Sequence, residues 1–147
     1  MVIDERMIEM IQVMPNLHFK GNCKQAIELY KKAFGAEVKT LLSYSDANPE
    51  DFVMDDESQK NLVYHSEIII GNHRLMLNDT TEDDDNFQTG NSLSLLVHFD
   101  SVDELKMAYA ILADGAEIIS PMESQTYCAC FASLADKYGM QWELMAG

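Results

Sequence analysis

The feature that most constrains this chain is an approximate internal repeat of about 75 residues, in which one order of predicted elements occurs twice. In each half a short apolar strand leads into one helix, and three more strands follow. This period is too long for a solenoid and is typical of two pseudo-symmetric halves. Because one helix covers only one face of a sheet, we expect an α+β fold of two tandem βαβββ modules. Their curved mixed sheets would surround a shared cleft, with the helices outside.

The first half, module 1 (about residues 11–79), contains the clearest helix. In residues 23–34 the apolar positions recur with a helical period, and Gly35 follows where a C-cap glycine is expected. Alternation and turn residues predict strands at 11–19, 37–44, 62–70 and 73–78, with a polar acidic loop at 45–61.

A polar segment separates the halves. The stretch 79–90 has no apolar period and is too polar to bury, so we predict a linker over about residues 80–90. It lacks the alternation and glycine of a calcium-binding EF-hand loop. In the second half, module 2 (about residues 91–147), strands are predicted at 92–99, 116–121, 127–134 and 140–145, with a helix at 101–114. A chain of 147 residues suits one domain, 1–147.

Composition excludes several classes of partner. A formal net charge of -15 opposes sequence-independent binding to nucleic acid or to an anionic membrane surface. Charged residues interrupt the N-terminal apolar residues, and no stretch reaches transmembrane length, so neither a signal peptide nor a membrane span is expected. The three cysteines form no CxxC pair, and this favours a reduced, cytoplasmic protein over a disulfide framework or zinc ribbon.

Four segments together resemble a known family. They are GNCKQAIELY (21–30), AFGAEV (33–38), HSEIIIGNHRLMLND (65–79) and DKYGMQWE (136–143). In this order they are similar to PhnB-like proteins of the vicinal oxygen chelate superfamily, which includes glyoxalases, bleomycin resistance proteins and extradiol dioxygenases. The resemblance implies the paired βαβββ fold, often as a homodimer, and a small-molecule ligand. Fold alone does not choose among lyases, isomerases, dioxygenases and antibiotic-binding proteins.

Some PhnB relatives carry the label of a demethylubiquinone methyltransferase. This sequence has no glycine-rich strand–turn–helix segment for a methyl-donor nucleotide, so we do not expect that activity.

The resemblance also implies where a metal would lie. In metal enzymes of this superfamily, the first and last strands of each half supply four ligands. The internal repeat, with Phe19 matched to Phe99 and Met76 to Glu143, assigns these positions to Met14, Met76, Ser94 and Glu143. Only Glu143 is a good ligand for a hard or borderline cation, so no cofactor is predicted. If the register is wrong by two residues, His18 or His98 joins Glu143, and His65 is a further candidate. A divalent metal is therefore the alternative.

Strand alternation selects the other candidate site residues. It directs His18 and His65 toward the cavity, as candidate ligand-binding residues together with Ser94 and Tyr127. Glu143, an acid within an apolar final strand, is the candidate general acid or base.

Two features near Tyr127 qualify this reading. Tyr127-Cys128 stands where relatives tend to have Trp-Gly. Cys128 and Cys130 share one strand face and resemble buried small hydrophobes more than a redox pair.

The sequence therefore predicts a small-molecule-binding protein with an apolar cleft and without a strongly held metal. The alternative is a divalent-metal-dependent enzyme of the same superfamily. An interaction module that uses the acidic loops is the weakest hypothesis.

Overall fold

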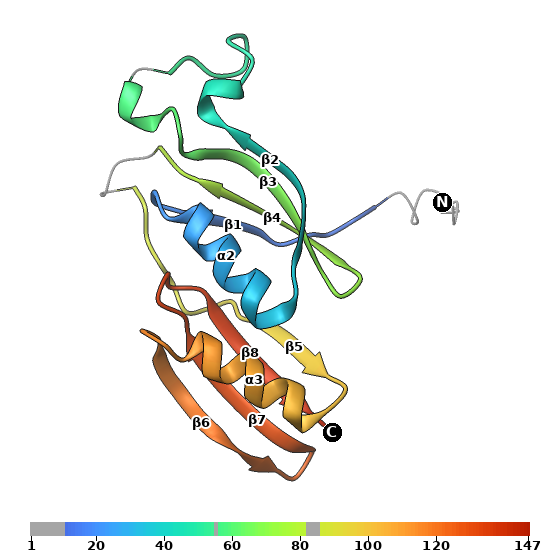
Figure 1. Ribbon diagram of the computed structural model, residues 1–147. Coiled ribbons are helices and arrows are strands. Elements are labelled where there is room, and N and C mark those ends of the chain that lie inside the picture. The colour runs from blue at the N-terminus through green and yellow to red at the C-terminus, as the bar shows by residue number, and fades with distance from the viewer. Residues whose placement is uncertain (1–10, 55, 82–85) are drawn as a thin grey trace, which may run out of the picture.

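The computed structural model describes residues 11–54, 56–81 and 86–147 (Figure 1). Within them, two four-stranded mixed sheets follow one another along the chain, each with one helix. This arrangement confirms the predicted α+β fold of two βαβββ modules. Neither of the helices in this described part is long and apolar enough to cross a membrane.

Module 1 contains one helix and one sheet in the order β1-β4-β3-β2, in which β1 is parallel to β4 and the other pairs are antiparallel. Two short 3-10 turns lie in the predicted acidic loop. The elements are β1 (Asn16–Phe19), α2 (Cys23–Phe34), β2 (Glu37–Ser43), η1 (Tyr44–Asp46), η2 (Glu57–Gln59), β3 (Val63–Ile70) and β4 (His73–Asp79).

Module 2 repeats this topology with the sheet order β5-β8-β7-β6, in which β5 is parallel to β8. Its elements are β5 (Leu95–Phe99), α3 (Val102–Leu112), β6 (Glu117–Gln125), β7 (Cys128–Ala135) and β8 (Gln141–Ala146).

The two parallel strand pairs have the same register. Asn16 lies opposite Met76 in module 1, and Leu96 lies opposite Glu143 in module 2. Phe19 and Phe99 occupy equivalent last positions of β1 and β5. The predicted matching of Phe19 to Phe99 and of Met76 to Glu143 therefore agrees with the observed pairing.

Several predicted strand limits were wrong. The strand predicted at 11–19 begins only at Asn16, because Pro15 has no N–H to donate to a ladder. Its carbonyl nevertheless accepts a hydrogen bond from the Met76 N–H at 2.9 Å. Met14 and Ser94 were predicted to lie within the first strands of their modules. Both lie just before them, since β1 begins at Asn16 and β5 at Leu95. The strand predicted at 116–121 extends to Gln125.

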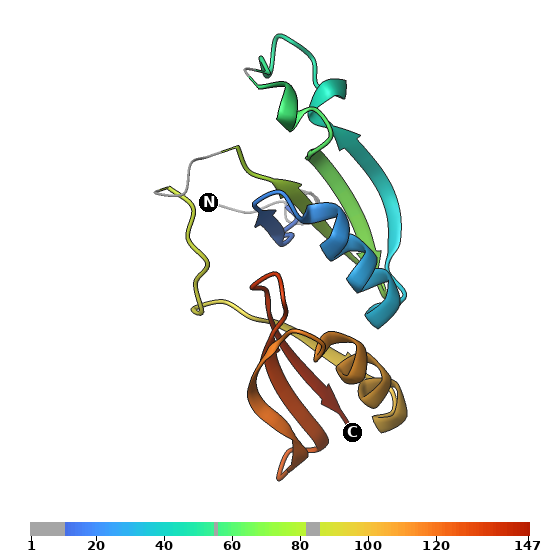
Figure 2. The same ribbon diagram turned by 60° about the vertical axis from the view of Figure 1, so that its left-hand side comes forward.

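Each sheet has one face covered by its helix and one that we call the open face. Alternation along β1 buries Leu17 and Phe19 beneath α2 and leaves Asn16 and His18 on the open face. Both helices lie in front of their sheets in Figure 1, so both open faces are turned away from the viewer. In Figure 2 the part of the linker drawn in yellow runs on the side of the molecule opposite the helices.

A buried carboxylate lies at the end of the last strand of module 1. Asp79 was predicted to begin the polar segment between the modules, but it ends β4 and is 1% exposed. Its Oδ1 accepts hydrogen bonds from the N–H groups of Gly21 (2.9 Å) and Cys23 (3.0 Å), and its Oδ2 from Val63 (2.9 Å). Because these donors include the first residue of α2, Asp79 stabilises the N-terminus of that helix.

A second buried carboxylate joins the modules. Asp136 Oδ2 accepts hydrogen bonds from the Tyr30 hydroxyl on α2 (2.7 Å) and from Trp142 Nε1 on β8 (2.9 Å). Its Oδ1 accepts from the N–H groups of Tyr138 and Met140. Burial, followed by the charge of Asp136, raises the pKa of the Tyr30 hydroxyl, so this group remains a donor at neutral pH. Helices α2 and α3 also contact each other.

We expect Tyr30→Phe to lower the free energy of unfolding by about 1–3 kcal/mol, because it removes one donor from a buried carboxylate. Urea unfolding followed by circular dichroism would measure the change. Tyr127→Phe is the matched control, since Tyr127 is 64% exposed. Equal stability of the two variants would contradict the role given to the Tyr30 hydroxyl.

Candidate functional site

The open face of the first sheet carries a hydrogen-bonded pair at the junction of β1 and β4. His18 Nδ1 lies 2.7 Å from Asn78 Oδ1, and the two residues are direct partners in the parallel ladder. The amide oxygen can only accept, so His18 carries its proton on Nδ1 in this contact. When the imidazole is neutral, its Nε2 is left as an acceptor.

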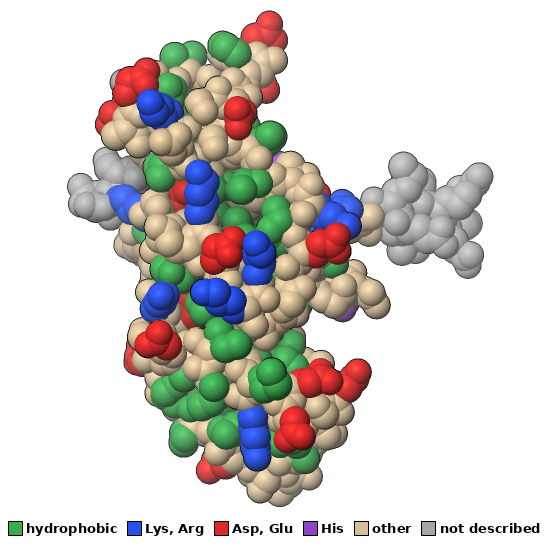
Figure 3. Space-filling view, viewed as in Figure 1, with side chains coloured by type: hydrophobic (Ala, Val, Ile, Leu, Met, Phe, Trp, Pro, Cys, Tyr) green, Lys and Arg blue, Asp and Glu red, His purple; other side chains and the backbone are tan. Residues whose placement is uncertain are grey.

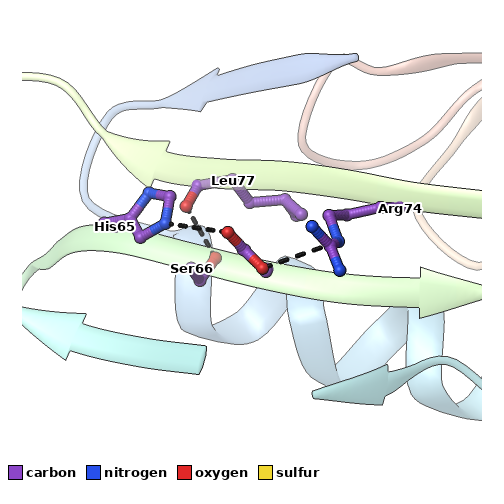
Figure 4. Close-up of polar contacts among 5 residues, drawn as sticks. His65, Ser66, Arg74 and Leu77 are labelled. Carbon is purple, nitrogen blue, oxygen red and sulfur yellow. Dashed lines mark hydrogen bonds and ion pairs between the residues drawn. The ribbon is translucent and has the colours of Figure 1, made fainter. Parts of the chain in front are cut away.

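A second polar group lies on the same open face (Figure 4). The Glu67 carboxylate lies between His65 and Arg74, with 3.4 Å from Oε1 to His65 Nε2 and 3.6 Å from Oε2 to Arg74 Nε. These side chains are 36%, 21% and 48% exposed for His65, Glu67 and Arg74. Ion pairs this exposed contribute little to stability. Their chemical effect is to orient an imidazole and a guanidinium toward solvent.

The open face of the second sheet carries Glu143. Ser94 Oγ donates a hydrogen bond to Glu143 Oε2 at 3.2 Å, and Ser133 on β7 lies opposite Glu143 in the ladder. Tyr127, in the turn between β6 and β7, is exposed, and its ring lies 6.3 Å from that of Phe131. A carboxylate with one hydroxyl donor can accept a proton or a further hydrogen bond from a ligand.

The five predicted site residues therefore fall into separate groups. Ser94 and Glu143 are brought into contact, His18 and His65 share one open face, and Tyr127 lies apart at a turn. Sequence reasoning missed Asn78, Glu67 and Arg74. Strand alternation could have found them, because Glu67 shares a face with His65, and both Arg74 and Asn78 share one with Met76.

The four positions implied for metal ligands do not fit a divalent ion. Of Met14, Met76, Ser94 and Glu143, the last two are joined by a hydrogen bond. Two thioethers, one hydroxyl and one carboxylate are a poor ligand set for a hard or borderline cation. Within residues 11–54, 56–81 and 86–147, no three His, Cys, Asp or Glu side chains form a group that could hold a metal.

The cysteines do not form a reactive site. Burial and the nearby Asp79 raise the pKa of the Cys23 thiol to about 12, so the thiolate is scarce at neutral pH. Cys128 and Cys130 are free and buried, as predicted for small core hydrophobes.

Two hollows open on the described surface. One, of about 510 Å³, lies between β1, the turn before β8 and part of the linker, and His18 lines it. The other, of about 710 Å³, is mainly apolar and lies between the modules. None of the five predicted site residues lines the larger hollow.

Comparison with known proteins agrees with this architecture. Protein YjdN of Escherichia coli strain K12 is 23% identical over 134 residues, which cover 87% of this chain and 90% of that protein. A Bacillus cereus structure described as a putative 3-demethylubiquinone-9 3-methyltransferase, PhnB protein, has a TM-score of 0.78 at 23% identity, covering 93% of this chain and 100% of that one.

A more distant structure of the same fold contains a metal. The fosfomycin resistance protein FosX from Listeria monocytogenes, complexed with Mn(II) and 1S,2S-dihydroxypropylphosphonic acid, has a TM-score of 0.62 at 15% identity, covering 94% of this chain and 93% of that one. At this identity the likeness shows the fold alone.

A family model described as 3-demethylubiquinone-9 3-methyltransferase matches residues 11–145. The description names an activity that the sequence does not lead us to expect, and membership does not assign it. The match nevertheless covers nearly the whole chain, in agreement with the PhnB structure and with the segments that resemble PhnB-like proteins. The chain therefore belongs to this family, the PhnB-like branch of the vicinal oxygen chelate fold.

Proposed function

We propose that this protein binds a small molecule against the open faces of its sheets. The observation that carries the proposal is the arrangement of His65, Glu67 and Arg74, which holds a histidine and a cation in fixed directions on one open face. Stability does not account for such an exposed arrangement, because exposed ion pairs contribute little. A ligand that accepts hydrogen bonds would find oriented donors there.

Apolar side chains on the same faces would bind the body of the ligand. Leu42 is 40% exposed beside His65, and Leu96 is 55% exposed opposite Glu143. Burial of such surface is worth roughly 25 cal/mol for each Å² removed from water. His18, His65, Ser94 and Tyr127 are the proposed polar contacts of the ligand, and Glu143 is the proposed acid or base if the ligand reacts.

A screen of small organic acids and neutral heterocycles by thermal shift tests this function. A true ligand at about 100 times its Kd adds about 2.7 kcal/mol, which is roughly 5–10 °C in Tm for a chain of this size. We expect His65→Ala or Glu143→Gln to abolish the shift. Glu28→Gln is the matched control, because Glu28 is exposed on α2, which covers the other face of the first sheet, and it lines neither hollow. A library without any stabilising compound would favour the interaction module.

The second candidate is a divalent-metal-dependent enzyme. The FosX complex with Mn(II) favours it, because that protein has the same fold. The ligand set of this chain argues against it, since Glu143 is the one carboxylate among the four implied positions.

Elemental analysis of protein purified without chelator separates the two candidates. We expect less than stoichiometric Zn, Mn, Fe and Ni, because thioethers and a hydroxyl bind these ions weakly. A stoichiometric metal that is lost in Glu143→Ala would overturn the metal-free proposal and support the enzyme.

The proposal includes a homodimer in a reducing compartment such as the cytoplasm. Among the described strands, β1 and β5 each pair on one side only. Both open faces lie on one side of the chain, with exposed Leu42 and Leu96. All three cysteines are free. Light scattering should give twice the chain mass of 16.6 kDa. A monomer at every concentration tested would exclude the dimer.

A further inference from the structure

The larger hollow lies between the modules. The polar groups of the open faces do not line it, although Leu96, which lies opposite Glu143, does. It has a volume of about 710 Å³, and its lining comes from the end of α2, the turn between β3 and β4, β5 and α3. Figure 3 shows hydrophobic side chains gathered over module 2 on the helix side. Ligand pockets in proteins commonly measure about 300–1,000 Å³, so this hollow is large enough for a small organic molecule.

Aromatic rings form the floor of this cavity. The ring of Phe34 lies 4.7 Å from that of Trp142 and 6.3 Å from that of Phe99, with 27° between the planes of the two phenylalanines. Phe34 comes from module 1 and the other two rings from module 2. Trp142 is 1% exposed, so the partly buried rings of Phe34 and Phe99 offer the flat surface to an aromatic or planar guest.

The walls are aliphatic and adaptable. Leu95, Ile111 and Met107 line them, and Met107 is 69% exposed on α3. Methionine fills irregular gaps readily because its side chain is unbranched and polarisable. Because the hollow opens on the surface and its lining is mainly apolar, a guest that enters it would remove apolar side chains from water.

Charges around the cavity have both signs. Lys32 contributes a cation, Asp100 and Glu104 contribute anions, and His73 and His98 complete the polar part of the lining. Cation and anions together do not select one ligand charge, so the aromatic and aliphatic surface is the part of the lining that selects the guest. The lining therefore fits an uncharged guest.

We propose that this cavity binds a flat, uncharged apolar molecule, at a site distinct from the polar groups of the open faces. Trp142 is the only tryptophan in the chain, and it lines the cavity, so its emission reports occupancy directly.

The test uses N-phenylnaphthylamine, an uncharged apolar fluorophore that accepts energy from tryptophan. We expect saturable transfer from Trp142 with one site per chain. Met107→Glu and Met107→Lys should each weaken binding at least about tenfold, because either charge would have to lose water next to the bound probe. Ile119→Glu and Ile119→Lys are matched controls, since Ile119 is 51% exposed on β6 outside the cavity.

Four results would overturn the proposal, and three of them come from the probe titrations alone. They are the absence of saturable transfer, equal weakening by the Ile119 variants, and full affinity in Met107→Lys. Light scattering is run on the same samples. Probe affinity that falls as protein concentration and mass rise would show that a second copy of the chain covers the cavity, and this would also overturn it. His65→Ala should leave the probe signal unchanged, so failure here and failure of the proposed function remain distinguishable.

Discussion

The hydrogen bonds of Asp136 are the interaction on which the relation between the modules depends. A carboxylate that is 4% exposed is costly to bury unless every oxygen is paired. Here four donors surround it, and one of them, the Tyr30 hydroxyl, comes from the other module. The same carboxylate fixes the indole of Trp142, whose ring packs against Tyr30 and Phe34. The buried carboxylate therefore acts together with these ring contacts and with the contact of α2 and α3 to hold the modules around the inter-module cavity.

The two modules have the same backbone fold, but the side chains at equivalent positions differ. Met76 and Glu143 occupy the same place in their strand pairs, so one sheet presents a thioether where the other presents a carboxylate. Asp79 corresponds in the same way to Ala146. Module 1 needs that carboxylate because α2 has no side-chain cap from Asn22, whereas α3 is capped by its own Ser101. The pseudo-symmetric scaffold thus supports two different surfaces.

The element order and the strand faces could be predicted, because both depend on local periodicity. Matching Phe19 to Phe99 and Met76 to Glu143 aligned equivalent positions of the two halves, in agreement with the common register of the two parallel pairs. The buried carboxylates could not be found in this way. In the sequence, Asp79 comes just before an acidic run and cannot be told apart from it. Asp136 accepts one of its hydrogen bonds from Tyr30, which lies 106 positions away in the chain. Strand alternation could have placed Glu67 and Arg74 on the open face, but their contact depends on the pairing of β3 with β4.

The cap that Asp79 supplies to α2 also has a consequence for the order of folding during synthesis. The helix is complete in the chain long before its cap, because Asp79 lies 56 positions beyond Cys23. A nascent chain that ends short of Asp79 has α2 without the acceptor for its first N–H groups. Isolated helices of this length are marginal in water. The acceptor for the first N–H groups of α2 therefore becomes available only when the last strand of module 1 has been synthesised, so the helix is completed late in the translation of that half.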